Sequence, residues 1–139
     1  MIGAFGGFDV SASGLTADQE WLNVVAENLA NMNTTITAAG TPYQQEAVVM
    51  APGSTFAQQL QGAGVHVAAI VQSNAPFPLQ YDPQSPLANA QGFVRQSNVN
   101  EVAQMTDLTA ASASYQANVT AMSIEEADAQ QAQRILQSL

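Results

Sequence analysis

Apolar residues recur at seven-residue intervals near both ends of this 139-residue chain. Near the N-terminus the repeat consists of Phe8, Leu15, Leu22 and Leu29, with a second set three residues earlier at Phe5, Ala12, Gln19 and Ala26. Near the C-terminus the repeat consists of Leu108, Tyr115, Met122, Ala129 and Leu136. This spacing places side chains on one face of an α-helix and is typical of helices that pack on other helices. The sequence therefore predicts two long helices with apolar stripes.

The residues between these helices follow a different pattern. All six prolines lie between positions 42 and 86, where they separate short apolar segments. We expect strands at 47–51 and 65–71, a loop at 54–64 and extended chain at 74–89. The fold class is thus mainly α with a small β insert. We expect helices 1–35 and 98–139 to pair as a coiled-coil-like hairpin, or to pack on copies in neighbouring subunits, with a β-rich insert at 36–97.

The ends of the predicted helices carry helix-start and helix-breaking signals. Asn98 followed by Glu101 resembles a capping box, which would begin the second helix at residue 98. Glycines weaken the first helix, and Gly14 alone costs about 1 kcal/mol relative to alanine. Exposed apolar stripes of this length favour association with partners.

Charge and composition exclude several classes of protein. The net charge is −9, lysine is absent, and Arg95 and Arg134 are the two cationic side chains. Nucleic-acid binding and attraction to anionic membranes need clustered cations, so we expect neither. The apolar run at 65–71 is far too short to insert across a bilayer. Because the chain has no cysteine, it has no disulfide, thiolate nucleophile or cysteine-ligated metal.

Candidate catalytic groups are few. His66 is the single histidine and no G-x-S-x-G motif accompanies it, so we interpret it as a surface position on a strand. Glu125, Glu126 and Asp128 match no calcium-loop spacing and are interpreted as a solvated helix face. We expect no catalytic, cofactor-binding or metal-binding residues, and we expect that the protein is not an enzyme.

Several motifs resemble those of one protein family. The sequences ASGLTA (12–17) and LNVVAENLAN (22–31), with Thr34, resemble the N-terminal signature of bacterial flagellar rod and hook proteins. The sequences GTPY (40–43), YDPQSPLANAQGFV (81–94) and ASASYQANV (111–119) are similar, in the same order, to those of the proximal rod protein FlgC family.

This resemblance implies a structural subunit of the flagellar basal-body rod, which crosses the periplasm and transmits torque through helix–helix packing. It implies export by the flagellar type III apparatus without a cleaved signal peptide. The implied partners are copies of the chain, other rod proteins and the adaptor between the rod and the membrane ring. Two alternatives stay open: another flagellar axial subunit, and a helical export chaperone or binding module.

The chain departs from the family pattern in one respect. Gln44 and Gln45 follow Tyr43, and Ala113 precedes Ser114, where the family pattern leads us to expect basic residues. Hydrogen bonds from glutamine would then have to replace salt bridges.

We expect the assembly interface to use one face of each helix. Ala12 and Gly14 offer a low surface that another backbone can approach, while the asparagines and Gln116 offer hydrogen bonds within or between subunits. The predicted interface residues are Phe8, Ala12, Gly14, Leu15, Leu22, Ala26, Asn28, Leu29, Asn31, Leu108, Tyr115, Gln116, Asn118, Val119, Met122 and Leu136.

Overall fold

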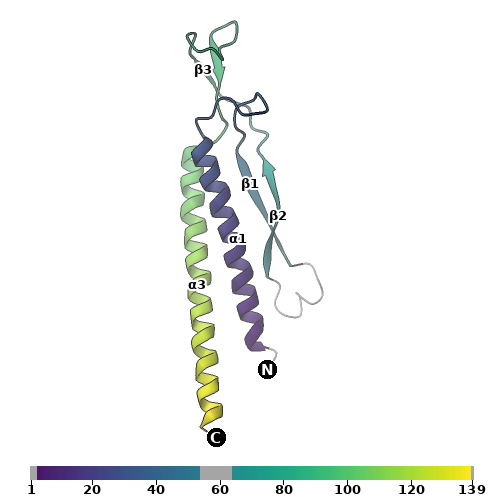
Figure 1. The fold of residues 1–139 in the computed structure, drawn as a ribbon, viewed down its shortest axis with the longest axis vertical. Coiled ribbons are helices and arrows are strands. Elements are labelled where there is room, and N and C mark those ends of the chain that lie inside the picture. Colours follow the sequence, from purple (N-terminus) through teal and green to yellow (C-terminus); the bar gives the residue numbers. More distant parts are fainter. Residues whose placement is uncertain (1–2, 54–63, 139) are drawn as a thin grey trace.

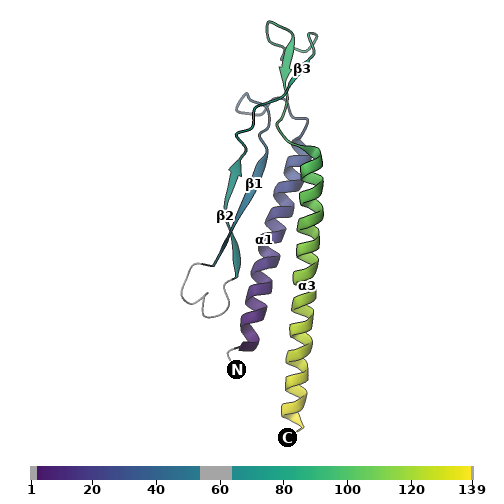
Figure 2. The same ribbon diagram turned by 180° about the vertical axis from the view of Figure 1, so that it is seen from behind.

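The computed structural model of the protein describes residues 3–53 and 64–138. Two long helices, α1 (Gly3–Asn31) and α3 (Glu101–Gln137), lie side by side and run in opposite directions (Figure 1). The molecule is elongated, with both chain ends at the same end of the helix pair (Figure 2). The predicted class, two helices around a small β insert, is confirmed.

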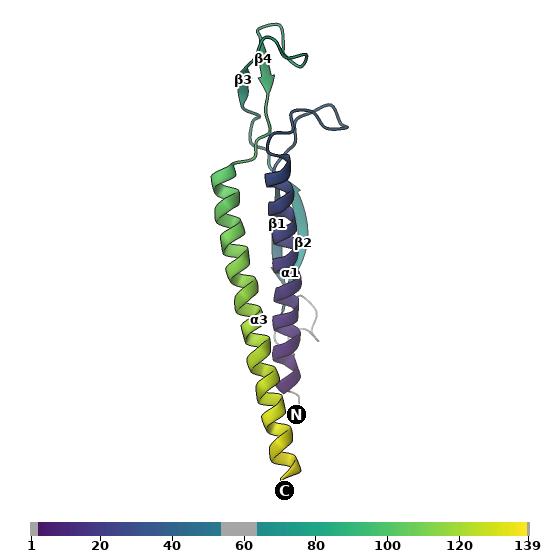
Figure 3. The ribbon, with the colours of Figure 1, turned by 60° about the vertical axis from the view of Figure 1, so that its left-hand side comes forward.

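Two antiparallel hairpins make up the described part of the insert. Strands β1 (Glu46–Pro52) and β2 (Val65–Gln72) pair with each other alongside α1. Strands β3 (Leu79–Tyr81) and β4 (Phe93–Arg95) pair beyond the end of the helix pair (Figure 3). The predicted strands at 47–51 and 65–71 are confirmed, whereas the predicted extended segment at 74–89 contains β3 followed by turns. The predicted loop lies almost wholly outside the described residues.

The second helix begins later than predicted. Its N-cap is Asn100, whose side chain accepts a hydrogen bond of 3.0 Å from the backbone N of Ala103. Asn98 cannot cap the helix, because its Oδ1 accepts from the backbone N of Gln45 and its Nδ2 donates to the carbonyl of Ala75. The prediction of a cap at Asn98 is therefore wrong, since the insert already engages that side chain.

The alternation of half-buried and exposed side chains that a regular strand shows holds only for the first residues of β2. Val49 pairs with Ala69 and Met50 with Val67, so Ala68 is left without a partner in a β-bulge. Val65 and Val67 are half-buried, whereas Ala69 and Val71 are exposed. A bulge is set by the pairing of two strands, so the pattern within one strand did not reveal it.

The core of the described residues is thin. Its buried apolar side chains are Ala17, Val24, Val25, Val94 and Ala111. Many large apolar residues on α3 and on the hairpins stay exposed. No helix in the described residues combines the length and the apolar character needed to cross a bilayer.

Candidate assembly interface

The face of α1 that α3 covers is mainly small and polar. Buried residues on α1 recur at spacings of three and four, and those that form this face are Ser11, Gly14, Asp18, Val25 and Asn28. The opposing positions on α3 recur every seven residues and are Gln104, Ala111, Asn118 and Glu125. We call these two sets the helix-pair face.

Asp18 joins the two helices at the middle of the helix-pair face. It is 4% exposed, and its Oδ2 accepts hydrogen bonds of 2.9 Å from Ser114 Oγ and 2.8 Å from Asn118 Nδ2. Burial removes the water that would otherwise hydrogen-bond this carboxylate, and two neutral donors take the place of that water. Neither donor is charged, so the contact adds no cation to the interface.

Glycines let the helices approach closely. A Cβ on Gly14 would lie 2.7 Å from Asn118 Nδ2, and a Cβ on Gly7 would overlap the Glu125 carboxylate. Moving seven residues forward along α1, from Gly7 to Gly14, therefore corresponds to moving seven residues backward along α3, from Glu125 to Asn118. The same register places Asn28 opposite Gln104, where a hydrogen bond of 2.8 Å joins them. Gly14, which was predicted to be approached by another backbone, contacts the Asn118 side chain on α3 within the same chain.

Asn28 connects both helices to the insert. It is fully buried, and its Nδ2 donates to the Glu46 carbonyl at 2.7 Å and to Gln104 Oε1 at 2.8 Å. Its Oδ1 accepts from the Glu46 backbone N at 2.8 Å and from the Tyr43 hydroxyl at 3.1 Å. Burial, together with the Glu46 and Glu27 carboxylates, raises the pKa of Tyr43 to about 12. The hydroxyl therefore keeps the proton that it donates.

Glutamines hold the insert where basic residues were expected. Gln44 Nε2 donates to the Ser73 carbonyl at 3.2 Å, and Gln45 Oε1 accepts from the Asn100 backbone N at 3.1 Å. Both glutamines therefore form hydrogen bonds of the kind expected of them.

The acidic cluster on α3 differs in part from the predicted solvated face. Glu126 and Asp128 are exposed, as expected, but Glu125 turns toward Gly7 and its Oε2 is buried without a hydrogen-bond partner. The cause is the close approach of α1, which covers this one position of the cluster. Within the part of the chain that the structure describes, no cluster of three or more metal-ligating side chains occurs.

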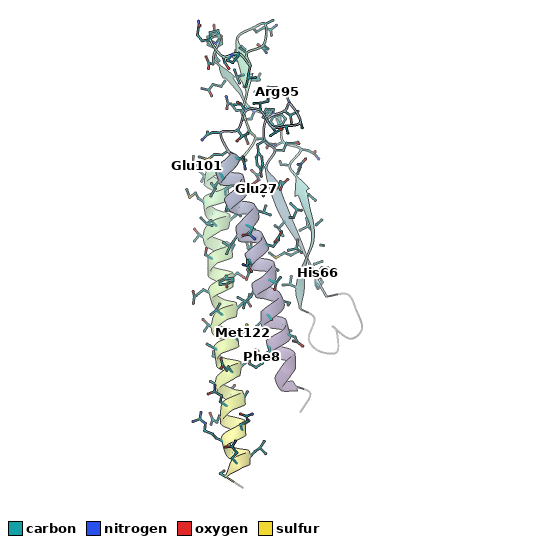
Figure 4. All side chains as sticks on the ribbon, viewed as in Figure 1. Phe8, Glu27, His66, Arg95, Glu101 and Met122 are labelled. Atoms are coloured by element: carbon teal, nitrogen blue, oxygen red, sulfur yellow. The ribbon has the colours of Figure 1, made fainter. Side chains whose placement is uncertain are left out.

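The predicted apolar stripe runs along the margin of the helix-pair face. Leu15 and Leu29 each follow a position of that face by one residue, Leu22 follows Trp21, and all three leucines are half-buried. Phe8 on α1 and Met122 on α3, both half-buried, lie at the same level of the pair (Figure 4). We call Phe8, Leu15, Leu22 and Leu29, with Leu108, Tyr115 and Met122, the outer stripe. Its residues retain apolar surface that this chain does not cover.

The other predicted interface residues divide into two groups. Asn28 and Asn118 bond within the chain, and Asn31 bonds locally to the Glu27 carbonyl. Those left exposed are Ala12, Ala26, Gln116, Val119 and Leu136. His66 is exposed on β2, as predicted.

Sequence reasoning missed Asp18, Gln104 and Ser114. Gln104 and Asn118 belong to a seven-residue repeat, as do Ser11 and Asp18. That repeat mixes polar and apolar residues, so a search for apolar periodicity passed over it. A search for any seven-residue repeat of small and polar residues would have found it.

A helix pair joined mainly by small and polar residues, with a partly exposed apolar stripe at its margin, is typical of a structural protein. Comparison with known proteins agrees. Residues 8–35 match the family model described as flagella basal body rod protein, and residues 90–135 match that of the flagellar basal body rod FlgEFG protein C-terminal.

Relatives that align over most of the chain identify the family more closely. The chain is 43% identical to the flagellar basal-body rod protein FlgC of Escherichia coli O6:H1 over 116 residues, which cover 81% of this chain and 82% of the relative. It is 40% identical to FlgC of Bacillus subtilis over 86% and 89% of the two chains, and 33% identical to FlgC of Borreliella burgdorferi over 98% and 99%. The chain belongs to the FlgC family of flagellar basal-body rod proteins and is a structural rod subunit.

Proposed function

We propose that this chain forms part of the proximal rod and transmits torque through helix–helix packing in a tubular assembly. The observation that carries the proposal is the outer stripe. Within one chain the helices are joined by polar and small residues, so the apolar repeat remains available to neighbouring subunits. Burial of apolar side chains is worth roughly 1.5–3 kcal/mol each. Repeated around a tube, such contacts supply a stiff connection.

In this proposal, the coiled-coil-like packing predicted from the sequence forms between the helices of adjacent subunits in the assembled rod. α1 and α3 would form the rod core with helices of adjacent subunits, and the insert at 36–97 would lie outside that core. The leucines at the margin of the helix-pair face would then be enclosed from both sides. The predicted interface residues that bond within the chain stabilise the subunit itself, and the half-buried and exposed ones keep the intersubunit role proposed for them from the sequence.

Family membership supports the rest of the proposal. The relatives are named as basal-body rod proteins. We therefore place this chain in the rod where it crosses the periplasm, in contact with copies of itself, other rod proteins and the adaptor to the membrane ring. Delivery would be by the flagellar type III export apparatus.

Aspartate substitutions in the outer stripe test the proposal. Leu22→Asp and Leu29→Asp would place a carboxylate against a neighbouring subunit, at a cost of several kcal/mol for an unpaired charge. We expect cells that carry either change to lack complete rods and not to swim. The control is Asn23→Asp, an exposed neighbour on α1 that adds the same charge.

Two measurements accompany this test. Thermal unfolding of each purified variant separates loss of assembly from loss of folding. Complete rods and normal swimming in both leucine variants would refute the role of the stripe. A helical chaperone, the alternative from another class, predicts slow hydrogen exchange throughout the free monomer, whereas a rod subunit predicts fast exchange at its unpartnered helix ends.

A further inference from the structure

One end of the molecule carries no net charge. We call residues 32–45 and 73–100 the head, which contains the β3–β4 hairpin (Figure 1). The charged residues of the head are Asp82 and Arg95, so the net charge of −9 belongs to the rest of the chain. An acidic partner therefore meets the least repulsion at the head.

The head contains an apolar groove between the loop after α1 and the β3–β4 hairpin. Its exposed apolar side chains are Ile36 (52%), Leu79 (60%), Leu87 (42%) and Phe93 (37%), and Arg95 lines it beside them. We call these five residues the head groove. A two-stranded hairpin with this much exposed apolar surface is marginal alone, which favours a bound partner.

An aromatic ring holds Arg95 in place, and among the described residues no carboxylate forms an ion pair with it. Its guanidinium lies 4.6 Å from the centre of the Phe77 ring, in a cation–π contact. The aromatic ring orients the side chain but leaves its positive charge for an incoming carboxylate. Figure 4 shows Arg95 on the head, away from the helix pair.

The opposite end of the molecule has the complementary character. α3 extends past the start of α1, and every residue from 126 to 138 is exposed (Figure 3). Ile124, Asp128, Gln131 and Ile135 are spaced by four, three and four residues, so they share one helix face. We call them the tail stripe. Ile124 is 57% and Ile135 is 56% exposed.

We infer that the tail stripe of one copy binds the head groove of a second copy, with Asp128 facing Arg95. The head groove presents four apolar side chains and a positive charge, while the tail stripe presents two exposed isoleucines, Gln131 and a negative charge. Because they lie at opposite ends of an elongated molecule, each bound copy leaves one free groove and one free stripe. Such a heterologous contact does not close on itself and extends an assembly along its axis. This contact rests on the proposed function but adds a specific axial joint to it.

Engineered cysteines test the contact, since the chain has none of its own. Ile36→Cys marks the head groove and Gln131→Cys marks the tail stripe. The two sites lie at opposite ends, whereas a disulfide needs Cα atoms within about 7 Å, so any cross-link joins two molecules. Under mild oxidation we expect dimers when the two variants are mixed, and a ladder of oligomers from the double variant.

Several outcomes would overturn the inference. These are dimers from either single variant alone, which indicate head-to-head or tail-to-tail contact, and the absence of dimers in the mixture. Thr109→Cys, exposed in the first third of α3, serves as a matched control. A cross-link between Thr109→Cys and Gln131→Cys, at or above the yield of the head-to-tail mixture, would place the tail on the helix pair instead.

Charge exchange tests the pairing of Asp128 with Arg95. Arg95→Glu in the head variant, or Asp128→Arg in the tail variant, should lower the dimer yield about fivefold, which corresponds to about 1 kcal/mol for an exposed ion pair. Combining the two changes in one mixture should restore the yield, which excludes simple damage to the head. No recovery would overturn the pairing.

The contact and the proposed function fail separately. If Leu22→Asp abolishes rods while no head-to-tail cross-link forms, the axial joint is wrong and the function of the outer stripe stands. If the cross-link forms and Leu22→Asp cells swim, the axial joint stands and the proposed function of the outer stripe is wrong.

Discussion

Asn28 uses every hydrogen-bonding group of its side chain. Both amide protons and both lone pairs of Oδ1 are engaged, with partners on β1, on α3 and on Tyr43. A fully satisfied buried amide is compatible with one arrangement of its partners. The asparagine in the family-like NLAN sequence at 28–31 therefore fixes the position of the insert on the helix pair. This role is internal to the chain and needs no neighbour.

The pH dependence of stability follows from Tyr43. Its pKa is raised from 10.0 to about 12, so the folded state holds the phenol proton more tightly than the unfolded state. The stability from this proton is fully present below pH 10 and is lost as the pH rises toward about 12. We expect the native chain to lose its stability advantage over Tyr43→Phe across this interval.

Urea midpoints of the two proteins, measured every half unit of pH from about pH 8 upward, check this prediction. The remaining tyrosines, Tyr81 and Tyr115, are common to both proteins and cancel in the difference. A difference that does not change with pH would show that the proton on Tyr43 contributes nothing.

At the scale of the helices, the close approach at Gly14 sets the register. Gly14→Leu would force Asn118 away from Asp18 and separate α1 from α3. We expect a net loss of about 1–2 kcal/mol in the free energy of unfolding, after the roughly 1 kcal/mol that replacing a helical glycine returns. Ala12→Leu adds the same side chain two residues earlier at an exposed position, and should leave stability within about 0.5 kcal/mol.

Circular dichroism during urea unfolding measures both variants. Equal stability of Gly14→Leu and Ala12→Leu would show that the helices do not depend on this contact.

Much of the fold could be predicted from the sequence because periodicity and proline position are local signals. The seven-residue apolar repeats predict both helices, and the turn residues around 47–51 and 65–71 isolate two strands. Three features depend on partners distant in sequence. Asn98 does not cap α3 because its Oδ1 accepts a hydrogen bond from the Gln45 backbone N, Ala68 is left unpaired where β2 pairs with β1, and α1 covers Glu125 at Gly7. None of these is encoded near the residue concerned.

The interface could be predicted only in part for the same reason. Leu15, Leu22 and Leu29 lie half-buried beside the face of α1 that α3 covers, but the residues that join α3 are mainly the polar and small ones. An apolar repeat shows that a helix has a face to bury. It does not show whether that face is covered by the same chain or by another.

At the scale of the whole molecule, charge opposes assembly. Each copy carries a net charge of −9, so two copies repel before any specific contact forms. Raising the ionic strength from 0.01 M to 0.15 M shortens the screening length from about 30 Å to about 8 Å. We therefore expect self-association of the purified chain to strengthen as salt is added.

This dependence separates two origins of association. Salt would weaken the attraction between Arg95 and Asp128. It would weaken the repulsion between two strongly acidic chains more, because that repulsion involves many charges. Salt does not screen the apolar contacts of the outer stripe and the tail stripe. Sedimentation velocity at fixed protein concentration over this salt range measures the balance. Association that falls steadily with salt would mean that ion pairs dominate and that the apolar stripes are not what holds copies together.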